Sequence, residues 1–188
     1  MDALFTSFLL AALGEWGDKT QLLALAFGLR FGRPAPVLAG VAVGALLNAA
    51  LAAAGGTFVH GFITLRATSL LVAVALLYAG VAGLMTPKKP DLAENWKTGP
   101  FVTTAVCFFL LEFGDKTQFL TFAISAQFGA VALAAVGATA GVLVSSAPAV
   151  LLGPQLERAV PTRAIRIGVA ILFLLAGFVV AVSALRLV

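Results

Sequence analysis

The chain has 188 residues, of which 61% are hydrophobic and 11% are charged, and its mean hydropathy is +1.08. Soluble domains are nearer half apolar and a quarter charged, and a soluble fold of this size would leave too much apolar surface in water. The composition therefore excludes a soluble enzyme, a nucleic-acid-binding module and a disordered chain, and it indicates an integral membrane protein. The single cysteine, Cys107, excludes a disulfide within the chain.

Long apolar runs without alternating polarity predict membrane-spanning helices rather than the strands of a barrel. A spanning helix needs about 20 residues, and the runs are separated by Gly, Pro and charged residues, which punctuate helices. The expected fold class is thus an all-α integral membrane protein with six transmembrane helices. We expect these helices at 3–29, 36–59, 67–85, 101–126, 131–152 and 164–185.

A seven-residue motif occurs twice with six identities. Residues 15–21, EWGDKTQ, recur 97 positions later at 112–118 as EFGDKTQ. The same offset aligns further glycines along the helices that follow, which extends the match beyond the motif. We therefore expect two homologous repeats of three helices each, at 1–86 and 100–188, joined by a linker at 87–99.

Three helices per repeat is an odd number, so the second repeat would enter the membrane from the opposite side. Such inverted repeats are typical of secondary transporters. Cationic residues are concentrated in the first, third and fifth loops, and by the positive-inside rule these loops are cytoplasmic, which places both termini outside. That side holds Arg30, Arg33, Lys88, Lys89, Lys97, Arg158, Arg163 and Arg166, and the other side holds Arg66 and Arg186.

Four of the eight acidic residues lie within predicted spans, and all four belong to the two motifs. An ionisable side chain at the bilayer centre costs about 3 kcal/mol or more, so such residues usually serve a function. A structural ion pair at i,i+4 spacing is the alternative, formed by Glu15 with Lys19 and by Glu112 with Lys116. It would leave the two motif aspartates, Asp18 and Asp115, unexplained.

On one helix Glu15, Asp18 and Lys19 would share a face, and inverted symmetry would bring the matching face of the fourth helix towards it. Four carboxylates and two ammonium groups then meet near the midplane with a formal charge of −2, which matches one divalent cation. Oxygen ligands suit Mn²⁺, Ca²⁺ or Mg²⁺ rather than copper or zinc. The expected ligands are Glu15, Asp18, Glu112 and Asp115, with charge balance from Lys19 and Lys116 and accessory ligand or pathway roles for Thr20, Gln21, Thr117, Gln118 and Asn48.

Glycines accompany the motifs. Gly14, Gly17 and Gly114 are expected to act as hinges, because glycine lets a helix loosen and expose its carbonyls, as in the broken helices of transporters. Close packing of helices is the other explanation for such small residues. The GxxxG pairs at 40–44 and 137–141 are expected to pack helices within the protomer rather than to mark a dimer, and a homo-oligomer stays open.

Two E-x-G-D-[KR]-[ST] motifs in two homologous halves resemble the Gdt family of membrane cation/proton antiporters. The resemblance covers essentially the whole chain, although the long acidic central loop of some members is reduced to Asp91 and Glu94. It implies that Mn²⁺ or Ca²⁺ is transported in exchange for protons, as substrate and not as cofactor, with the motif acids as the cation site. Bacterial members export manganese, and the short chain without a targeting extension suggests such a member, a transporter rather than an enzyme, in the bacterial cytoplasmic membrane. Both motifs match in full, at Glu15, Gly17, Asp18, Lys19 and Thr20, and at Glu112, Gly114, Asp115, Lys116 and Thr117.

The chemistry of the residues supports antiport. Clustered carboxylates titrate as a coupled group, so such a site can hold a divalent cation when ionised and take up protons when the cation leaves. Two other classes remain open. A passive divalent-cation channel is usually built around an axis along the membrane normal, which inverted repeats do not provide. An intramembrane aspartyl protease would use two aspartates to activate water, and it gains nothing from the paired Glu, Lys and Gln residues.

Overall fold

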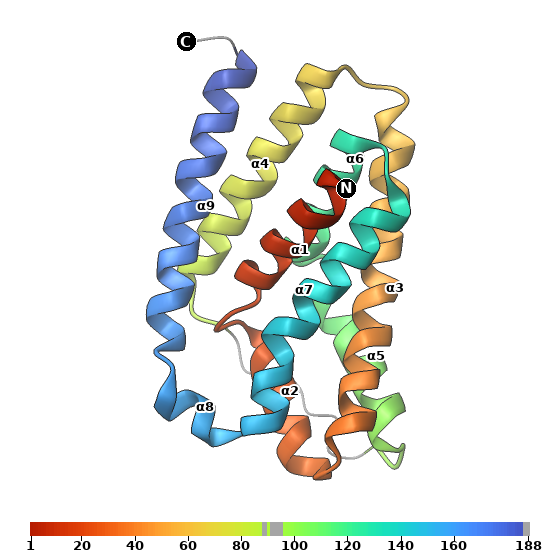
Figure 1. Cartoon of the computed structure of the whole chain (residues 1–188), viewed down its shortest axis with the longest axis vertical. Helices are drawn as coiled ribbons and strands as arrows, with labels where there is room; N and C mark the ends of the chain where they lie inside the picture. Colours follow the sequence, from red (N-terminus) through yellow and green to blue (C-terminus); the bar gives the residue numbers. More distant parts are fainter. Residues whose placement is uncertain (88–89, 91–95, 186–188) are drawn as a thin grey trace.

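The structure, a computed structural model, describes residues 1–87, 90 and 96–185, with the backbone alone for 157–159. Over these residues the chain is all-helical, as predicted, with nine α-helices and no strand (Figure 1). The helices are α1 (Asp2–Gly14), α2 (Lys19–Phe31), α3 (Pro34–His60), α4 (Leu65–Leu84), α5 (Pro100–Glu112), α6 (Lys116–Phe128), α7 (Val131–Leu152), α8 (Pro154–Ala159) and α9 (Thr162–Leu185).

Four of the described helices are long and apolar enough to cross a membrane: α3, α4, α7 and α9, with 27, 20, 22 and 24 residues. They correspond to the expected helices at 36–59, 67–85, 131–152 and 164–185. Their outward faces are apolar, as α9 illustrates with Leu175, Phe178 and Val179, each more than 60% exposed. A surface of this kind suits hydrocarbon rather than water.

The expectation of unbroken helices at 3–29 and 101–126 is wrong. Each segment is divided at its motif into two helices of 13 residues. Such a helix is about 20 Å long at 1.5 Å per residue, whereas the hydrocarbon core is about 30 Å thick. The physical cause lies in Gly17 and Gly114, whose φ angles of 70° and 78° belong to a left-handed conformation that glycine adopts readily and a right-handed helix does not contain. Gly14 is the last residue of α1, immediately before the first break.

The long helices form the frame on which the broken ones lie. α3 and α7 pack against each other, α5 lies along α3, and α1 lies along α7. α4 and α9 form a second pair, side by side in Figure 1, and α6 packs against both α3 and α4. Both breaks, between α1 and α2 and between α5 and α6, therefore face the interior of one bundle.

The GxxxG pairs sit where the broken helices approach the long ones most closely. A Cβ added at Gly40 would lie 2.7 Å from the carbonyl oxygen of Phe101 in α5, and one at Gly137 would overlap the backbone of α1. The same holds one turn further on for Gly44 and Gly141. The prediction that these glycines pack helices within the protomer is confirmed.

Of the cationic residues used to orient the chain, those whose side chains the structure describes are exposed, with the exception of Arg166. The ends of α2 and α7 and the starts of α3 and α5 lie at one end of the molecule, together with α8, and the start of α1 and the end of α9 lie at the other (Figure 1). Arg166 needs correction: it lies within α9, half-buried, rather than in a loop. Lys88, Lys89, Asp91, Glu94 and Arg186, and the side chain of Arg158, lie outside the part of the chain that the structure describes.

Candidate cation site

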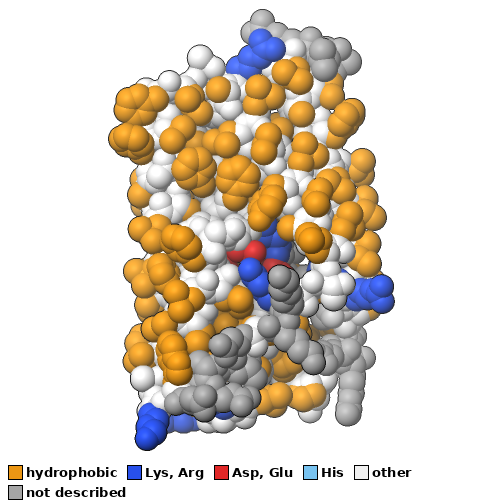
Figure 2. All heavy atoms as spheres, turned by 180° about the vertical axis from the view of Figure 1, so that it is seen from behind, with side chains coloured by type: hydrophobic (Ala, Val, Ile, Leu, Met, Phe, Trp, Pro, Cys, Tyr) orange, Lys and Arg blue, Asp and Glu red, His pale blue; other side chains and the backbone are white. Residues whose placement is uncertain are grey.

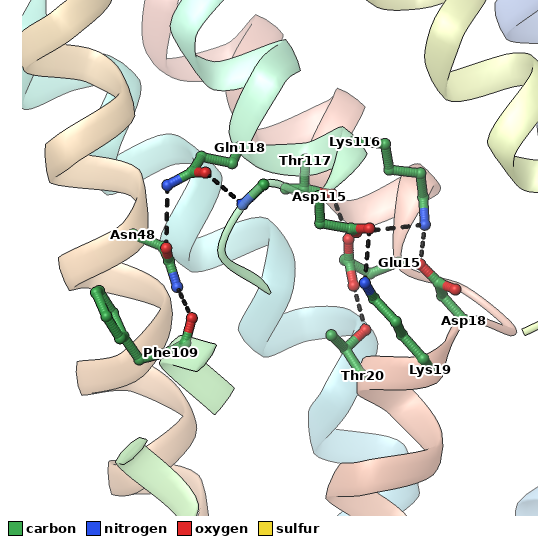
Figure 3. A network of polar contacts seen from close by, with 11 residues as sticks. Glu15, Asp18, Lys19, Thr20, Asn48, Phe109, Asp115, Lys116, Thr117 and Gln118 are labelled. Carbon is green, nitrogen blue, oxygen red and sulfur yellow. Dashed lines mark hydrogen bonds and ion pairs between the residues drawn. The ribbon is translucent and has the colours of Figure 1, made fainter. Parts of the chain in front are cut away.

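The two motifs meet in the middle of the bundle, where α1 gives way to α2 and α5 gives way to α6 (Figure 3). Glu15 directly follows α1 and Glu112 ends α5, whereas Asp18 and Asp115 stand at the N-caps of α2 and α6. Helix N-termini favour negative charge because their first N–H groups point outward. The backbone thus gathers four carboxylates at the ends of four half-helices. They do not share a helical face, as we had expected, because each helix ends within its motif.

Glu15 is fully buried and is held by a threonine of each motif. Thr20 donates a hydrogen bond to its Oε2, and Thr117 donates one to its Oε1 (Figure 3). The carboxylate of the first motif is therefore bound by the second motif as well as by its own. Both predicted threonines reach the site, where they contact the acid directly.

Glu112 is as deeply buried as Glu15 but is held less completely. Its Oε1 has no hydrogen-bond partner among the described residues, since Thr117 of its own motif is turned towards Glu15. Glu15, Glu112 and Asp115 each present a carboxylate oxygen, and these oxygens lie within 4.8 Å of one another. Three converging carboxylates are the ligands that a hard divalent cation prefers. The fourth predicted ligand, Asp18, does not belong to this group.

The lysines pair across the motifs. Lys19 Nζ lies 2.8 Å from Asp115 Oδ1, and Lys116 Nζ binds Asp18 Oδ2 and lies 3.8 Å from Asp115 Oδ2 (Figure 3). The alternative pairing of Glu15 with Lys19 and of Glu112 with Lys116 is not the one that forms, because the i,i+4 spacing brings side chains together only on an unbroken helix. Both aspartates therefore have an ion-pair partner that was not predicted from the sequence.

The site reaches one face of the molecule. In Figure 2 a small group of acidic and basic side chains interrupts an otherwise apolar surface at mid-height. The side chains of Lys19 and Asp115 are 24% and 14% exposed, against 6% for Lys116. The two ion pairs thus differ mainly in their lysines, because the aspartates are similarly exposed, at 14% for Asp115 and 13% for Asp18.

The position of Arg166 beside the first motif was not predicted from the sequence. Arg166 lines a small cavity together with Trp16 and Lys116, and its Nε is buried without a hydrogen-bond partner among the described residues. The sequence did contain a signal for this position, because Arg166 falls within the helix expected at 164–185. Its charge alone had assigned it to the fifth loop. It adds a third cationic side chain beside the first motif.

The predicted amide side chains lie near the acids but bond elsewhere. Gln21 and Gln118 each accept a hydrogen bond from a backbone N–H of their own motif and donate one to a long helix. Asn48 lies beside Glu112 and accepts the bond from Gln118 (Figure 3). The structure therefore brings all of the predicted residues together, in different local roles.

Two cavities at matching positions differ greatly in size. The first, of about 720 Å³, lies between α3, α4 and α6 and ends at Asp115. The second, of about 40 Å³, lies beside Gly17 and is closed by residues that include Leu156 of α8. We call them the Asp115 cavity and the Gly17 cavity. Five of their lining residues correspond at the 97-residue offset, namely Gly114 to Gly17, Gln118 to Gln21, Phe119 to Leu22, Phe122 to Leu25 and Ala52 to Ala149.

An all-helical membrane protein that concentrates carboxylates and lysines inside its spans has the features of an ion transporter. The family model described as divalent cation/proton antiporter GDT1 matches residues 3–91 and 100–187. The chain therefore belongs to this family, and the resemblance carried by the two motifs is confirmed.

The relatives agree with this assignment. A protein of Vibrio cholerae named "Putative manganese exporter" is 38% identical over 178 residues, which cover 93% of this chain and 88% of the relative. Proteins named "GDT1-like protein 3" from Oryza sativa subsp. indica and Arabidopsis thaliana are each 26% identical over 201 residues, covering 92% of this chain and 71% and 68% of the relatives. No solved structure matches the chain at a significant level.

Proposed function

We propose that the protein exchanges a divalent cation, Mn²⁺ or Ca²⁺, for protons by alternating access, and that it exports manganese from the cytoplasm. The observation that carries the proposal is the convergence of Glu15, Glu112 and Asp115 at the centre of a membrane protein of the cation/proton antiporter family. The cation is the transported substrate. The same carboxylates bind it when ionised and carry protons in the return step.

The proposed architecture is two inverted repeats, at 1–86 and 100–188, with each broken pair of helices counted as one crossing of six. It is supported by helix starts 97 positions apart, at 19 and 116 for α2 and α6, at 34 and 131 for α3 and α7, and at 65 and 162 for α4 and α9. Packing follows the same relation, since α5 lies along α3 as α1 lies along α7. The family model also matches one stretch in each half.

The lysines fit an exchange mechanism. Lys19 and Lys116 neutralise the motif aspartates across the two halves. A divalent cation among three carboxylates competes with Lys19 for Asp115. Because the carboxylates titrate as a coupled group, two protons in place of one cation keep the charge of the site constant. The loaded states then cross the membrane at similar cost.

The unequal cavities support alternating access. At the Asp115 cavity the site is approached through about 720 Å³ of space, while the corresponding approach at Gly17 is reduced to about 40 Å³. The second conformation would reverse this difference. With the cationic end of the bundle in the cytoplasm, the central linker lies inside and both termini outside, and the Asp115 cavity lies in the outer half of the bundle, between the second break and the ends of α3 and α6. The proposed location is a bacterial cytoplasmic membrane, in keeping with the relative from Vibrio cholerae.

The test is cation flux in liposomes that contain the purified protein. An acidic interior should drive uptake of Mn²⁺ or Ca²⁺, and an alkaline interior should drive release, with the membrane potential held at zero. A passive channel would conduct with no dependence on the pH gradient. Parallel measurements with both cations rank the two substrates.

A further inference from the structure

Two glutamine side chains occupy matching positions and make matching bonds at the helix breaks. Gln21 Oε1 accepts a hydrogen bond from the backbone N–H of Gly17 at 3.0 Å, and Gln118 Oε1 accepts one from Gly114 at 2.7 Å. Each glutamine is the third residue of its helix and reaches back over the N-terminus, much as the third residue of a capping box does. The N–H groups that they bind belong to the two left-handed glycines.

These N–H groups need a partner. A left-handed glycine interrupts the helical ladder, and at membrane depth an unsatisfied backbone group is tolerated only where other protein groups or water bind it. Gly17 stands between Glu15 and Asp18, and Gly114 stands between Glu112 and Asp115. The position of each glycine therefore sets the position of the two acids beside it.

The amide nitrogen of each glutamine ties the break to a long helix. Gln21 Nε2 donates to the carbonyl oxygen of Ser145 in α7 at 2.8 Å. Gln118 Nε2 donates to Asn48 Oδ1 in α3 at 3.1 Å, and Asn48 Nδ2 donates onward to the carbonyl oxygen of Phe109 in α5 at 2.7 Å (Figure 3). Asn48 and Ser145 are themselves 97 positions apart.

We propose that Gln21 and Gln118 are positioning residues, which hold the two breaks and their acids against α7 and α3, and that neither glutamine binds the cation. The side-chain oxygen is the one amide atom that could coordinate a cation, and in both glutamines it is bound to a glycine N–H. The inference rests on the proposed transport function, because its effect is measured as transport.

The two glutamines differ in one respect that supplies a control. Gln118 acts through a side chain, Asn48, which can be removed, whereas Gln21 acts through a backbone carbonyl, which cannot. In a double-mutant cycle, residues that act through each other lose function non-additively, and independent residues lose it additively.

The first experiment is proton-driven Mn²⁺ uptake, with maximal rate and half-saturating concentration measured separately. Gln118→Leu and Asn48→Ala should each lower the maximal rate by about 10-fold, and the double variant should be no slower than Gln118→Leu alone. Gln21→Leu combined with Asn48→Ala should lose about 100-fold, the product of the two separate losses. If the losses multiply in the double variant of Gln118 and Asn48 as they do in that of Gln21 and Asn48, the proposal is wrong.

A second variant separates positioning from ligation by the sign of its pH dependence. A protonated carboxyl at position 21 reproduces the bonds of the amide, because its C=O can accept from Gly17 and its O–H can donate to Ser145. The rate of Gln21→Glu relative to the unmodified protein should therefore rise as the pH falls from about 8 to about 6. A ligand role predicts the opposite, since an ionised carboxylate binds a cation better than an amide does.

A readout independent of transport keeps this inference apart from the proposed function. Hydrogen–deuterium exchange should rise at residues 113–116 in Gln118→Leu and at 16–19 in Gln21→Leu, with the other break unchanged in each case. Unchanged exchange at both breaks would refute the positioning role even in an active transporter. If exchange rises as expected but the unmodified protein moves no Mn²⁺ against a pH gradient, the proposed function is wrong and the positioning role stands.

Discussion

Lys19 of the first motif and Asp115 of the second form an ion pair, with 2.8 Å between Nζ and Oδ1. Their counterparts at the 97-residue offset are Lys116 for Lys19 and Asp18 for Asp115. Lys116 and Asp18 pair in the same crossed sense. Each motif therefore neutralises an acid of the other, and neither half of the chain completes the site alone. Because both pairs lie within the membrane-spanning bundle, loss of one partner leaves an uncompensated charge in a medium of low polarity.

The crossed pairing predicts a specific pattern of energetic coupling. Lys19→Ala and Asp115→Ala should be coupled by about 1–3 kcal/mol in thermal unfolding, because the two side chains contact each other. Lys19→Ala and Asp18→Ala should be coupled more weakly, although these two residues are neighbours in sequence, because they are linked only through the longer contact of Lys116 with Asp115. Equal coupling in the two cycles would contradict the crossed arrangement.

The two motif glutamates should differ in stability while sharing a transport defect. Glu15→Gln disturbs a carboxylate that accepts hydrogen bonds from Thr20 and Thr117, so it should lower the free energy of unfolding by about 1–3 kcal/mol. Glu112→Gln removes a buried carboxylate with an oxygen that no described residue hydrogen-bonds, and it should be neutral or stabilising. Thermal unfolding of both variants measures the difference, with Cys107→Ala as a control that leaves transport unchanged. Greater destabilisation by Glu112→Gln would show that the asymmetry is wrong.

The two left-handed glycines provide a matched test of the breaks. An alanine is strained at either position because of the positive φ, at a cost of about 1 kcal/mol. At Gly17 the added Cβ would also lie 2.7 Å from the carbonyl oxygen of Thr162, whereas at Gly114 it would meet nothing within 4 Å. Gly17→Ala should therefore be less stable than Gly114→Ala by about 1–3 kcal/mol. Equal melting temperatures would argue against the packing of α9 on the first break.

The cavities predict unequal accessibility at matching positions. In a Cys107→Ala background, a cysteine at Phe122 in the Asp115 cavity should react rapidly with a membrane-impermeant thiol reagent added outside. A cysteine at Leu25, its counterpart beside the Gly17 cavity, should react slowly from either side because that space is about 40 Å³. Rapid labelling of the Leu25 position from the cytoplasmic side, in protein without added cation, would contradict the closed state on that side.

Sequence patterns were sufficient to predict the long helices and to find the residues that gather at the two helix breaks. Apolar runs that exceed the membrane thickness identify α3, α4, α7 and α9, and the repeated EWGDKTQ motif identifies the acids that meet. Hydropathy did not reveal the breaks, because apolar residues flank each motif on both sides. Gly17 and Gly114 were the available signal, and glycine at such a position also fits close helix packing.

The partners of the motif side chains depend on tertiary structure and could not be predicted from the spacing within a motif. The crossed ion pairs depend on how α2 and α6 face each other, and a spacing of four residues within one motif predicts the wrong partner for Lys19. The bonds of Gln21 and Gln118 to α7 and α3 depend on the same placement. Arg166 was assigned to a loop on charge alone, and the helix that contains it carries it to the first motif.

The proposed exchange is tested most directly by Mn²⁺ flux in liposomes under an imposed pH gradient, with the membrane potential held at zero. We expect an acidic interior to drive Mn²⁺ uptake, a reversed gradient to drive release, and both Glu15→Gln and Glu112→Gln to abolish the flux at equal levels of inserted protein. Loss of either carboxylate removes one ligand and one proton-carrying group. Flux that ignores the direction of the pH gradient, or that persists at the unmodified rate in both variants, would contradict proton-coupled transport through these carboxylates.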